Sequence, residues 1–100
     1  MQEEKRLQES KLFTPYKLGS VELRNRVIRS AAFESMGKDF GPTQALKDYH
    51  VSVAKGGVGM TTVAYASINR SGISFNKQLW LRDEIVPQLR DLTDAVHNEG

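Results

Sequence analysis

Cysteine is absent from this chain of 100 residues, and long apolar runs and a large excess of one charge are absent as well. Without cysteine there is no disulfide, no thiolate metal ligand and no cysteine nucleophile. The longest apolar runs have only a few residues, whereas a helix needs about 20 to span a bilayer. No cationic segment leads into an apolar core and a small-residue cleavage site, which argues against secretion. We therefore expect no membrane partner.

What remains is the composition of an ordinary folded domain. Hydrophobic residues make up 39% of the chain and charged residues 26%, which excludes a disordered chain. The formal net charge of +2 is too small to indicate a nucleic-acid partner. Together with the lack of cysteine, these features are typical of a cytoplasmic protein.

A β-hairpin is predicted near the N-terminus, after a polar tail over residues 1–11. Apolar residues alternate on both sides of a two-residue Gly-Ser turn across residues 16–23. A short strand is then expected to begin at Val27, followed by a loop rich in glycine.

The first helix is predicted from its caps and its periodicity. Thr43 can accept hydrogen bonds at its N-terminus, and Gly56 ends it after Lys55, a cation that suits the helix dipole. Apolar residues at spacings of three and four predict its buried face: Leu46, Tyr49 and Val53.

A buried strand is predicted next, over residues 58–63, which are apolar or β-branched without a helical period. Residues 67–81 read as a second loop. A second amphipathic helix follows, with Asp83 as its N-cap and Pro87 in its first turn, where a missing N–H costs least.

The order of these elements indicates a parallel α/β fold. The two strand starts, at about Val27 and Val58, lie roughly 30 residues apart, which is the length of a βαβ repeat. Parallel strands are normally buried on both faces of a larger sheet, whereas two strands leave both edges open. A third strand is expected directly after Gly100. We therefore interpret the chain as the opening units of a larger α/β protein.

Three stretches of the chain carry a family resemblance. Residues 12–35 hold a Leu-Phe pair, a Pro, a short hairpin and an Asn-Arg pair in that order. Residues 46–72 hold a predicted helix, a Gly-Gly-x-Gly turn and a predicted strand, and residues 79–100 hold the second predicted helix. In this order they resemble the opening of the old yellow enzyme family, the FMN-dependent NADH:flavin oxidoreductases. The resemblance covers residues 12–100. It implies the N-terminal hairpin and the opening (β/α)2 units of a TIM (β/α)8 barrel, truncated before its third strand.

The resemblance also implies a cofactor and a reaction. FMN would take a hydride from NADH or NADPH and pass it to an activated alkene or similar small-molecule substrate. In such barrels the chemistry lies at the carboxyl ends of the strands. Small side chains and backbone groups there suit a flat flavin ring, although simple packing at the strand ends is the alternative reading of the same residues. The cofactor-binding residues implied are Ser30, Ala31, Ala32, Phe33, Tyr65 and Ala66.

One of these positions departs from the family pattern. Phe33 stands where the best-studied branches have a Thr or Cys that can hydrogen-bond the flavin, and a phenyl ring cannot make that contact. The family's catalytic residues and phosphate-binding groups come from later strands. The resemblance therefore places no catalytic residue and no metal ligand in this chain.

Both histidines fall on predicted helices, away from the carboxyl ends of the strands. His50 is interpreted as a helix-surface residue, and His97, in a last helical turn, as a partner of the helix dipole. The glycines of residues 56–59 follow a helix and precede a strand, the reverse of the order in a phosphate-binding loop. We interpret them as a helix end and a tight turn.

Other conspicuous side chains have structural interpretations. Trp80 is either a cap over the second loop or a platform for substrate, and Asp83 with Glu84 opens a helix rather than forming a catalytic carboxylate pair. A charged stretch is expected to form a solvated hairpin with ion pairs at the base of the barrel: Glu22, Arg24, Arg26 and Arg29.

Three functions remain open at this point. The chain can be the N-terminal part of an FMN-dependent oxidoreductase, a non-catalytic truncated fragment or remnant without flavin, or part of a different TIM-barrel enzyme. Oligomeric state, substrate and the choice between NADH and NADPH depend on residues outside the chain.

Overall fold

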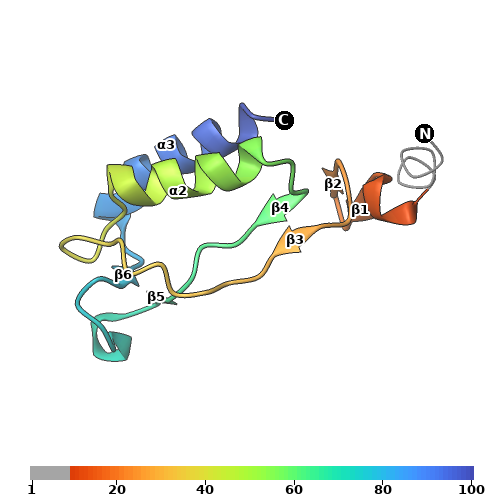
Figure 1. Cartoon of the computed structure of the whole chain (residues 1–100). Helices are drawn as coiled ribbons and strands as arrows, with labels where there is room; N and C mark the ends of the chain where they lie inside the picture. The colour runs from red at the N-terminus through yellow and green to blue at the C-terminus, as the bar shows by residue number, and fades with distance from the viewer. Residues whose placement is uncertain (1–9) are drawn as a thin grey trace.

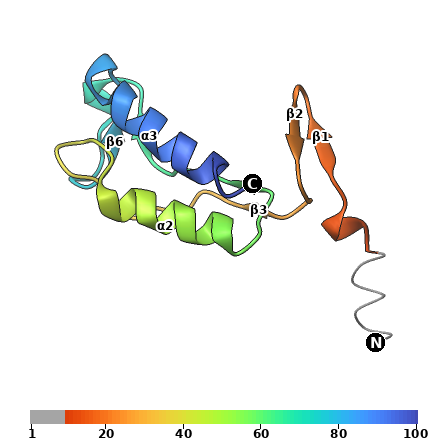
Figure 2. The same ribbon diagram turned by 90° about the horizontal axis from the view of Figure 1, so that it is seen from above.

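A β-hairpin stands at one end of the molecule (Figures 1 and 2). Strand β1 (Tyr16–Leu18) pairs antiparallel with β2 (Val21–Leu23) across the predicted two-residue turn. Gly19 in that turn has a φ of +60°, a conformation that glycine adopts at little cost. The computed structural model describes residues 10–100, so the expected polar tail lies outside the described residues except for its last two.

The predicted βαβ unit is confirmed. Strand β3 (Ile28–Arg29) runs parallel to β4 (Met60–Thr61), and helix α2 (Gln44–Lys55) connects them. Thr43 caps the helix as predicted, because its Oγ1 accepts a hydrogen bond from the Leu46 N–H at 3.1 Å. Local capping therefore determines where α2 begins.

The buried face of α2 differs in part from the predicted one. Its buried residues are Leu46, His50 and Ala54, whereas Tyr49 and Val53 are only half-buried. The interpretation of His50 as a helix-surface residue is wrong, since its side chain is 0% exposed. The spacing of four between the three buried positions places them on one side of the helix.

The second predicted loop contains two short strands. Strand β5 (Ala66–Ser67) pairs in parallel with β6 (Leu79–Trp80), and the Leu79 N–H donates to the carbonyl of Tyr65 at 3.1 Å. Strands of two residues are too short to show a hydrophobic period, so their pairing depends on tertiary contacts.

Helix α3 (Val86–His97) starts later than its predicted cap. Asp83 lies inside a preceding 3-10 helix and does not cap α3, whose first turn holds Pro87 as predicted. Residues 10–100 also hold three short 3-10 helices: η1 (Lys11–Phe13), η2 (Arg70–Gly72) and η3 (Asp83–Ile85).

The core lies between the two helices and the strand segments beneath them. Helices α2 and α3 lie side by side over one face of the β3–β4 pair (Figure 1). Leu46, Leu79 and Leu92 bring α2, β6 and α3 together, with Val63 and Leu89 packed against them. Residues 10–100 thus form an open part of an α/β fold, without a closed barrel. Within this range no helix has both the length and the apolar character needed to cross a bilayer.

Candidate functional site

The two segments predicted to bind the cofactor leave the same edge of the β3–β4 pair. Arg29 lies opposite Thr61 in the parallel register, so the residues that follow each strand run on in the same direction. Four residues further along each segment, the rings of Phe33 and Tyr65 meet edge to face with centroids 4.9 Å apart. The structure therefore brings together the ends of the two predicted segments.

A third ring joins this pair from the loop between β5 and β6. Phe75 stacks on Phe33 with centroids 5.0 Å apart and meets Tyr65 edge to face at 5.3 Å. We call these three residues the aromatic cluster. Tyr65 is 52% exposed and Phe75 45% exposed, so the cluster presents an apolar surface at the carboxyl ends of the strands. Sequence analysis missed Phe75, because only the loop's path brings it to Phe33.

The remaining predicted positions are small and accessible. Ser30, Ala31, Ala32 and Ala66 are all exposed. Within the part of the chain that the structure describes, the backbone N–H groups of Ala31 and Ala32 have no hydrogen-bond partner. This edge therefore combines free backbone donors with side chains too small to hide them.

Tyr65 has an unusual backbone conformation. Its φ of +49° lies in the left-handed region, which is uncommon for a bulky residue. The Tyr65 carbonyl accepts the hydrogen bond that starts the β5–β6 pair, so the sheet holds it in place. Such strain occurs most often at binding and active sites.

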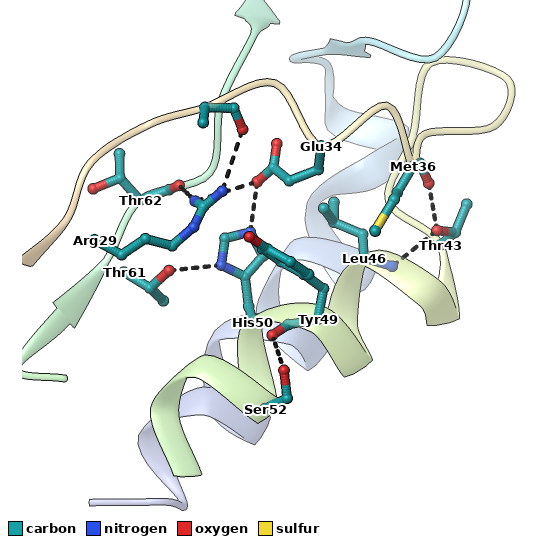
Figure 3. A network of polar contacts seen from close by, with 11 residues as sticks. Arg29, Glu34, Met36, Thr43, Leu46, Tyr49, His50, Ser52, Thr61 and Thr62 are labelled. Carbon is teal, nitrogen blue, oxygen red and sulfur yellow. Dashed lines mark hydrogen bonds and ion pairs between the residues drawn. The ribbon is translucent and has the colours of Figure 1, made fainter. Parts of the chain in front are cut away.

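A buried polar network lies directly beneath the first segment (Figure 3). Glu34 follows Phe33, and its side chain is 3% exposed. Its Oε2 accepts a hydrogen bond from His50 Nε2 at 2.7 Å and lies 3.7 Å from Arg29 Nη1. The other ring nitrogen of His50 lies 2.9 Å from Thr61 Oγ1. We call Arg29, Glu34, His50 and Thr61 the Glu34 network.

Arg29 links this network to the backbone on both sides. It donates to the Thr62 carbonyl at 2.7 Å and to the Ala32 carbonyl at 3.2 Å, and its guanidinium lies 4.9 Å from the centre of the Tyr49 ring. The expected ion pair of Arg29 is present, but it lies at the carboxyl end of β3 rather than at the base.

The base of the strands has a different arrangement from the expected ion pairs. Arg24 donates to three backbone carbonyls there, those of Ala54, Val58 and Glu99. Gly59 packs against Asn25, and Gly57 has a φ of +107°, in agreement with a turn rather than a phosphate loop.

Trp80 is half-buried in β6, where it lies opposite Ser67 of β5. The Arg82 guanidinium covers one face of its ring, 4.8 Å from the centroid. This contact favours the interpretation of Trp80 as a cap over the second predicted loop.

Known proteins share the sequence and the fold of this chain. A model described as the NADH:flavin oxidoreductase / NADH oxidase family matches residues 11–100. The 4,4'-dithiodibutanoate disulfide reductase of Rhodococcus erythropolis is 40% identical over 89 residues, which cover 89% of this chain and 22% of that protein. A probable N-methylproline demethylase of Rhizobium meliloti strain 1021 is 44% identical over 91 residues, covering 89% of this chain and 13% of that protein.

A solved structure supports the same relationship. Morphinone reductase in complex with tetrahydroNAD is 25% identical, with a TM-score of 0.80 over 91% of this chain and 25% of that chain. The chain spans less than a quarter of the length of the two curated relatives. The family model nevertheless matches nearly all of this chain, and the fold agrees with a solved relative along almost its whole length. The chain therefore belongs to the NADH:flavin oxidoreductase / NADH oxidase family.

Proposed function

We propose that residues 12–100 form the first two strand–helix units, with their N-terminal hairpin, of an FMN-binding (β/α)8 barrel. In this proposal residues 30–33 and Tyr65 with Ala66 line the flavin. The observation that carries it is the meeting of two accessible segments, with free backbone donors and small side chains, at the carboxyl ends of adjacent parallel strands. Active sites of such barrels lie at this end.

The residues at this edge fit FMN. A flat isoalloxazine has to approach the backbone closely, and Ala31 and Ala32 leave that approach open. The polar edge of the ring needs hydrogen-bond donors, which the free N–H groups of the same two residues supply. Phe33 offers no hydrogen bond, so in this chain the backbone rather than a side chain would hold the flavin at that position.

When bound, FMN supplies the redox chemistry, in which a hydride from NADH or NADPH passes to an activated alkene or similar small-molecule acceptor. The chain's own residues bind and orient the ring. Ala31 and Ala32 set how near it lies, their N–H groups fix its polar edge, and the aromatic cluster excludes water from one side. A dry, positioned site is what hydride transfer requires.

We assign no catalytic residue to this chain. Both ring nitrogens of His50 are hydrogen-bonded, one to Glu34 and the other to Thr61. His97 lies in the last turn of α3, away from the strand ends. The groups that hold the FMN phosphate and polarise the acceptor would come from other parts of the barrel.

Replacing Ala32 with Trp in the intact protein tests this proposal. The indole would occupy the space of the flavin ring without disturbing a buried contact, because Ala32 is exposed. We expect Ala32→Trp to lose most of its bound FMN, measured by flavin absorbance per protein after reconstitution, while its circular dichroism matches the wild type.

The matched control is Ala45→Trp, at an exposed position on α2, which should retain wild-type FMN content. Full FMN content in Ala32→Trp would remove Ala32 from the site. A wild-type protein that takes up no FMN would overturn the proposed function and favour a remnant without flavin.

A further inference from the structure

We propose that Glu34 is a positioning residue, which holds the flavin-lining segment in its binding conformation through His50 and Arg29. This inference rests on the proposed function, because it gives the Glu34 network a role toward FMN. The Glu34 carboxylate points toward Arg29 and His50, and its side chain is buried (Figure 3). It would act only through the backbone that it fixes.

The burial of the network is the first argument. The side chains of His50 and Glu34 are almost completely removed from solvent, although both are polar. Removing paired polar and charged groups from water is costly, and apolar residues of similar size often give equal or better stability. We therefore infer that this buried network fixes one arrangement of the chain rather than adding to its stability.

The second argument is where the network attaches. Arg29 immediately precedes residues 30–33 and Glu34 immediately follows them, and the two side chains approach each other at 3.7 Å. Arg29 also donates to the Ala32 carbonyl from beneath. The segment is thus tied at both ends and in the middle, while Ala31 and Ala32 remain open to a ligand.

The network also anchors the segment to the rest of the fold. Glu34 reaches α2 through His50, and His50 reaches β4 through Thr61. Arg29 also reaches the residue after β4 through the Thr62 carbonyl. The first lining segment and the start of the chain that leads to the second are therefore connected to the same helix.

The backbone next to Glu34 gives an independent observation. Ser35 has a φ of +57°, in the left-handed region that non-glycine residues rarely adopt. The Glu34 contacts hold the chain at the turn that ends the lining segment. Strain that the surrounding structure maintains at such a place is typical of preorganised sites.

If Glu34 preorganises the segment, its removal should lower the affinity for FMN. A free segment has to be ordered when the ligand binds, so the affinity falls even though no ligand contact is lost. We expect Glu34→Ala to weaken FMN binding roughly 10-fold, the lower end of the effect of removing a residue that orients a metal ligand. Glu34→Gln keeps an acceptor for His50 and should lie between Glu34→Ala and the wild type.

The experiment compares these variants in the intact protein by two readouts. FMN affinity is measured by titration of flavin fluorescence, and backbone order parameters are measured by NMR relaxation in the FMN-free protein. We expect lower order parameters in residues 30–34 of Glu34→Ala, with α2 and α3 as rigid as in the wild type. The order parameters do not depend on flavin binding.

A matched control lies on the same pair of helices. Asp91 accepts a hydrogen bond from Lys47 Nζ at 2.9 Å, between α3 and α2, and its side chain is 66% exposed. Asp91→Ala and Asp91→Asn remove a carboxylate from a surface pair, so they should leave both FMN affinity and the order parameters of residues 30–34 unchanged.

Two results would overturn the inference. One is wild-type FMN affinity in Glu34→Ala, and the other is a fall in order parameters spread equally over α2 and α3, which would indicate a purely structural role. If Glu34→Ala does not fold, Glu34→Gln decides by the same two readouts. A wild type without FMN binding defeats the proposed function alone, because the order parameters still report whether Glu34 restrains the segment.

Discussion

At the scale of single residues, Arg24 joins three segments that are far apart in the chain. Its guanidinium donates to the Ala54 carbonyl near the end of α2, to the Val58 carbonyl before β4, and to the Glu99 carbonyl after α3. Carbonyls at the end of a helix lack partners inside the helix and carry its partial negative charge. One cation therefore donates to all three carbonyls, of which that of Ala54 also accepts from the Gly57 N–H at 3.0 Å.

We predict that Arg24→Met lowers the free energy of unfolding of the intact protein by about 1–2 kcal/mol, because hydrogen bonds from a charged donor are lost. The urea midpoint measures this change. Arg90→Met, at an exposed position on α3, is the matched control and should keep the wild-type midpoint. An equal midpoint in Arg24→Met would show that water replaces the guanidinium without cost.

His50 shows why part of the candidate site could not be predicted from sequence. A histidine on a helix next to Tyr49 fits a surface position, and only the fold brings Glu34 and Thr61 to its two ring nitrogens. The spacing of four from Leu46 to His50 and on to Ala54 was the available signal. The prediction for residues 30–33 depended on family resemblance together with the rule for strand ends, and it remains a prediction.

At the scale of elements, locally encoded features were predictable and tertiary ones were not. The hairpin turn and the Thr43 cap need only neighbouring residues, and both are confirmed. The start of α3 was misplaced, because Asp83 enters a 3-10 turn before the helix. Strands β5 and β6 were missed because two paired residues leave no period in the sequence.

The entry to β4 depends on the absence of a side chain at Gly59. A Cβ there would lie 2.4 Å from the carbonyl oxygen of Asn25, while the Gly59 N–H donates to the Val27 carbonyl at 2.8 Å. The backbone of β3 and β4 cannot separate without losing that bond. A methyl group at this position therefore opposes the pairing of the two strands.

We predict that Gly59→Ala destabilises the intact protein by about 2 kcal/mol, within the usual range for overpacking. Thermal unfolding followed by circular dichroism measures the loss. Gly72→Ala is the control, since its Cβ would make only an ordinary contact of 3.4 Å with Ser67 Cβ. If both variants unfold at the same temperature as the wild type, the approach of Asn25 to Gly59 does not limit the side chain at this position.

At the scale of the whole molecule, the described chain is extended and leaves much apolar surface uncovered. Its radius of gyration is 16.0 Å, whereas a compact domain of this length has about 13 Å. The hairpin end alone exposes Leu12, Phe13, Tyr16, Leu18 and Val21. Apolar surface on this scale usually faces a partner or further parts of the same fold.

We predict that the isolated 100-residue chain, mixed with FMN, does not oxidise NADH or NADPH faster than free FMN does. Two strand ends bury too little of the flavin for tight binding, and none of the residues that the structure describes is placed to polarise an acceptor. Anaerobic assays that follow nicotinamide absorbance with an enone acceptor measure the rate. A rate well above the free-FMN control would mean that copies of the chain assemble a site by themselves.

The position of Trp80 makes the candidate site visible to optical spectroscopy. It is the only tryptophan of the chain, and its β6 strand pairs with β5, which begins at Ala66 in the second flavin-lining segment. Flavins absorb where indoles emit, so a flavin held against Ala66 would quench Trp80 by resonance energy transfer. In the intact protein, Trp80 is therefore a donor fluorophore for following flavin uptake.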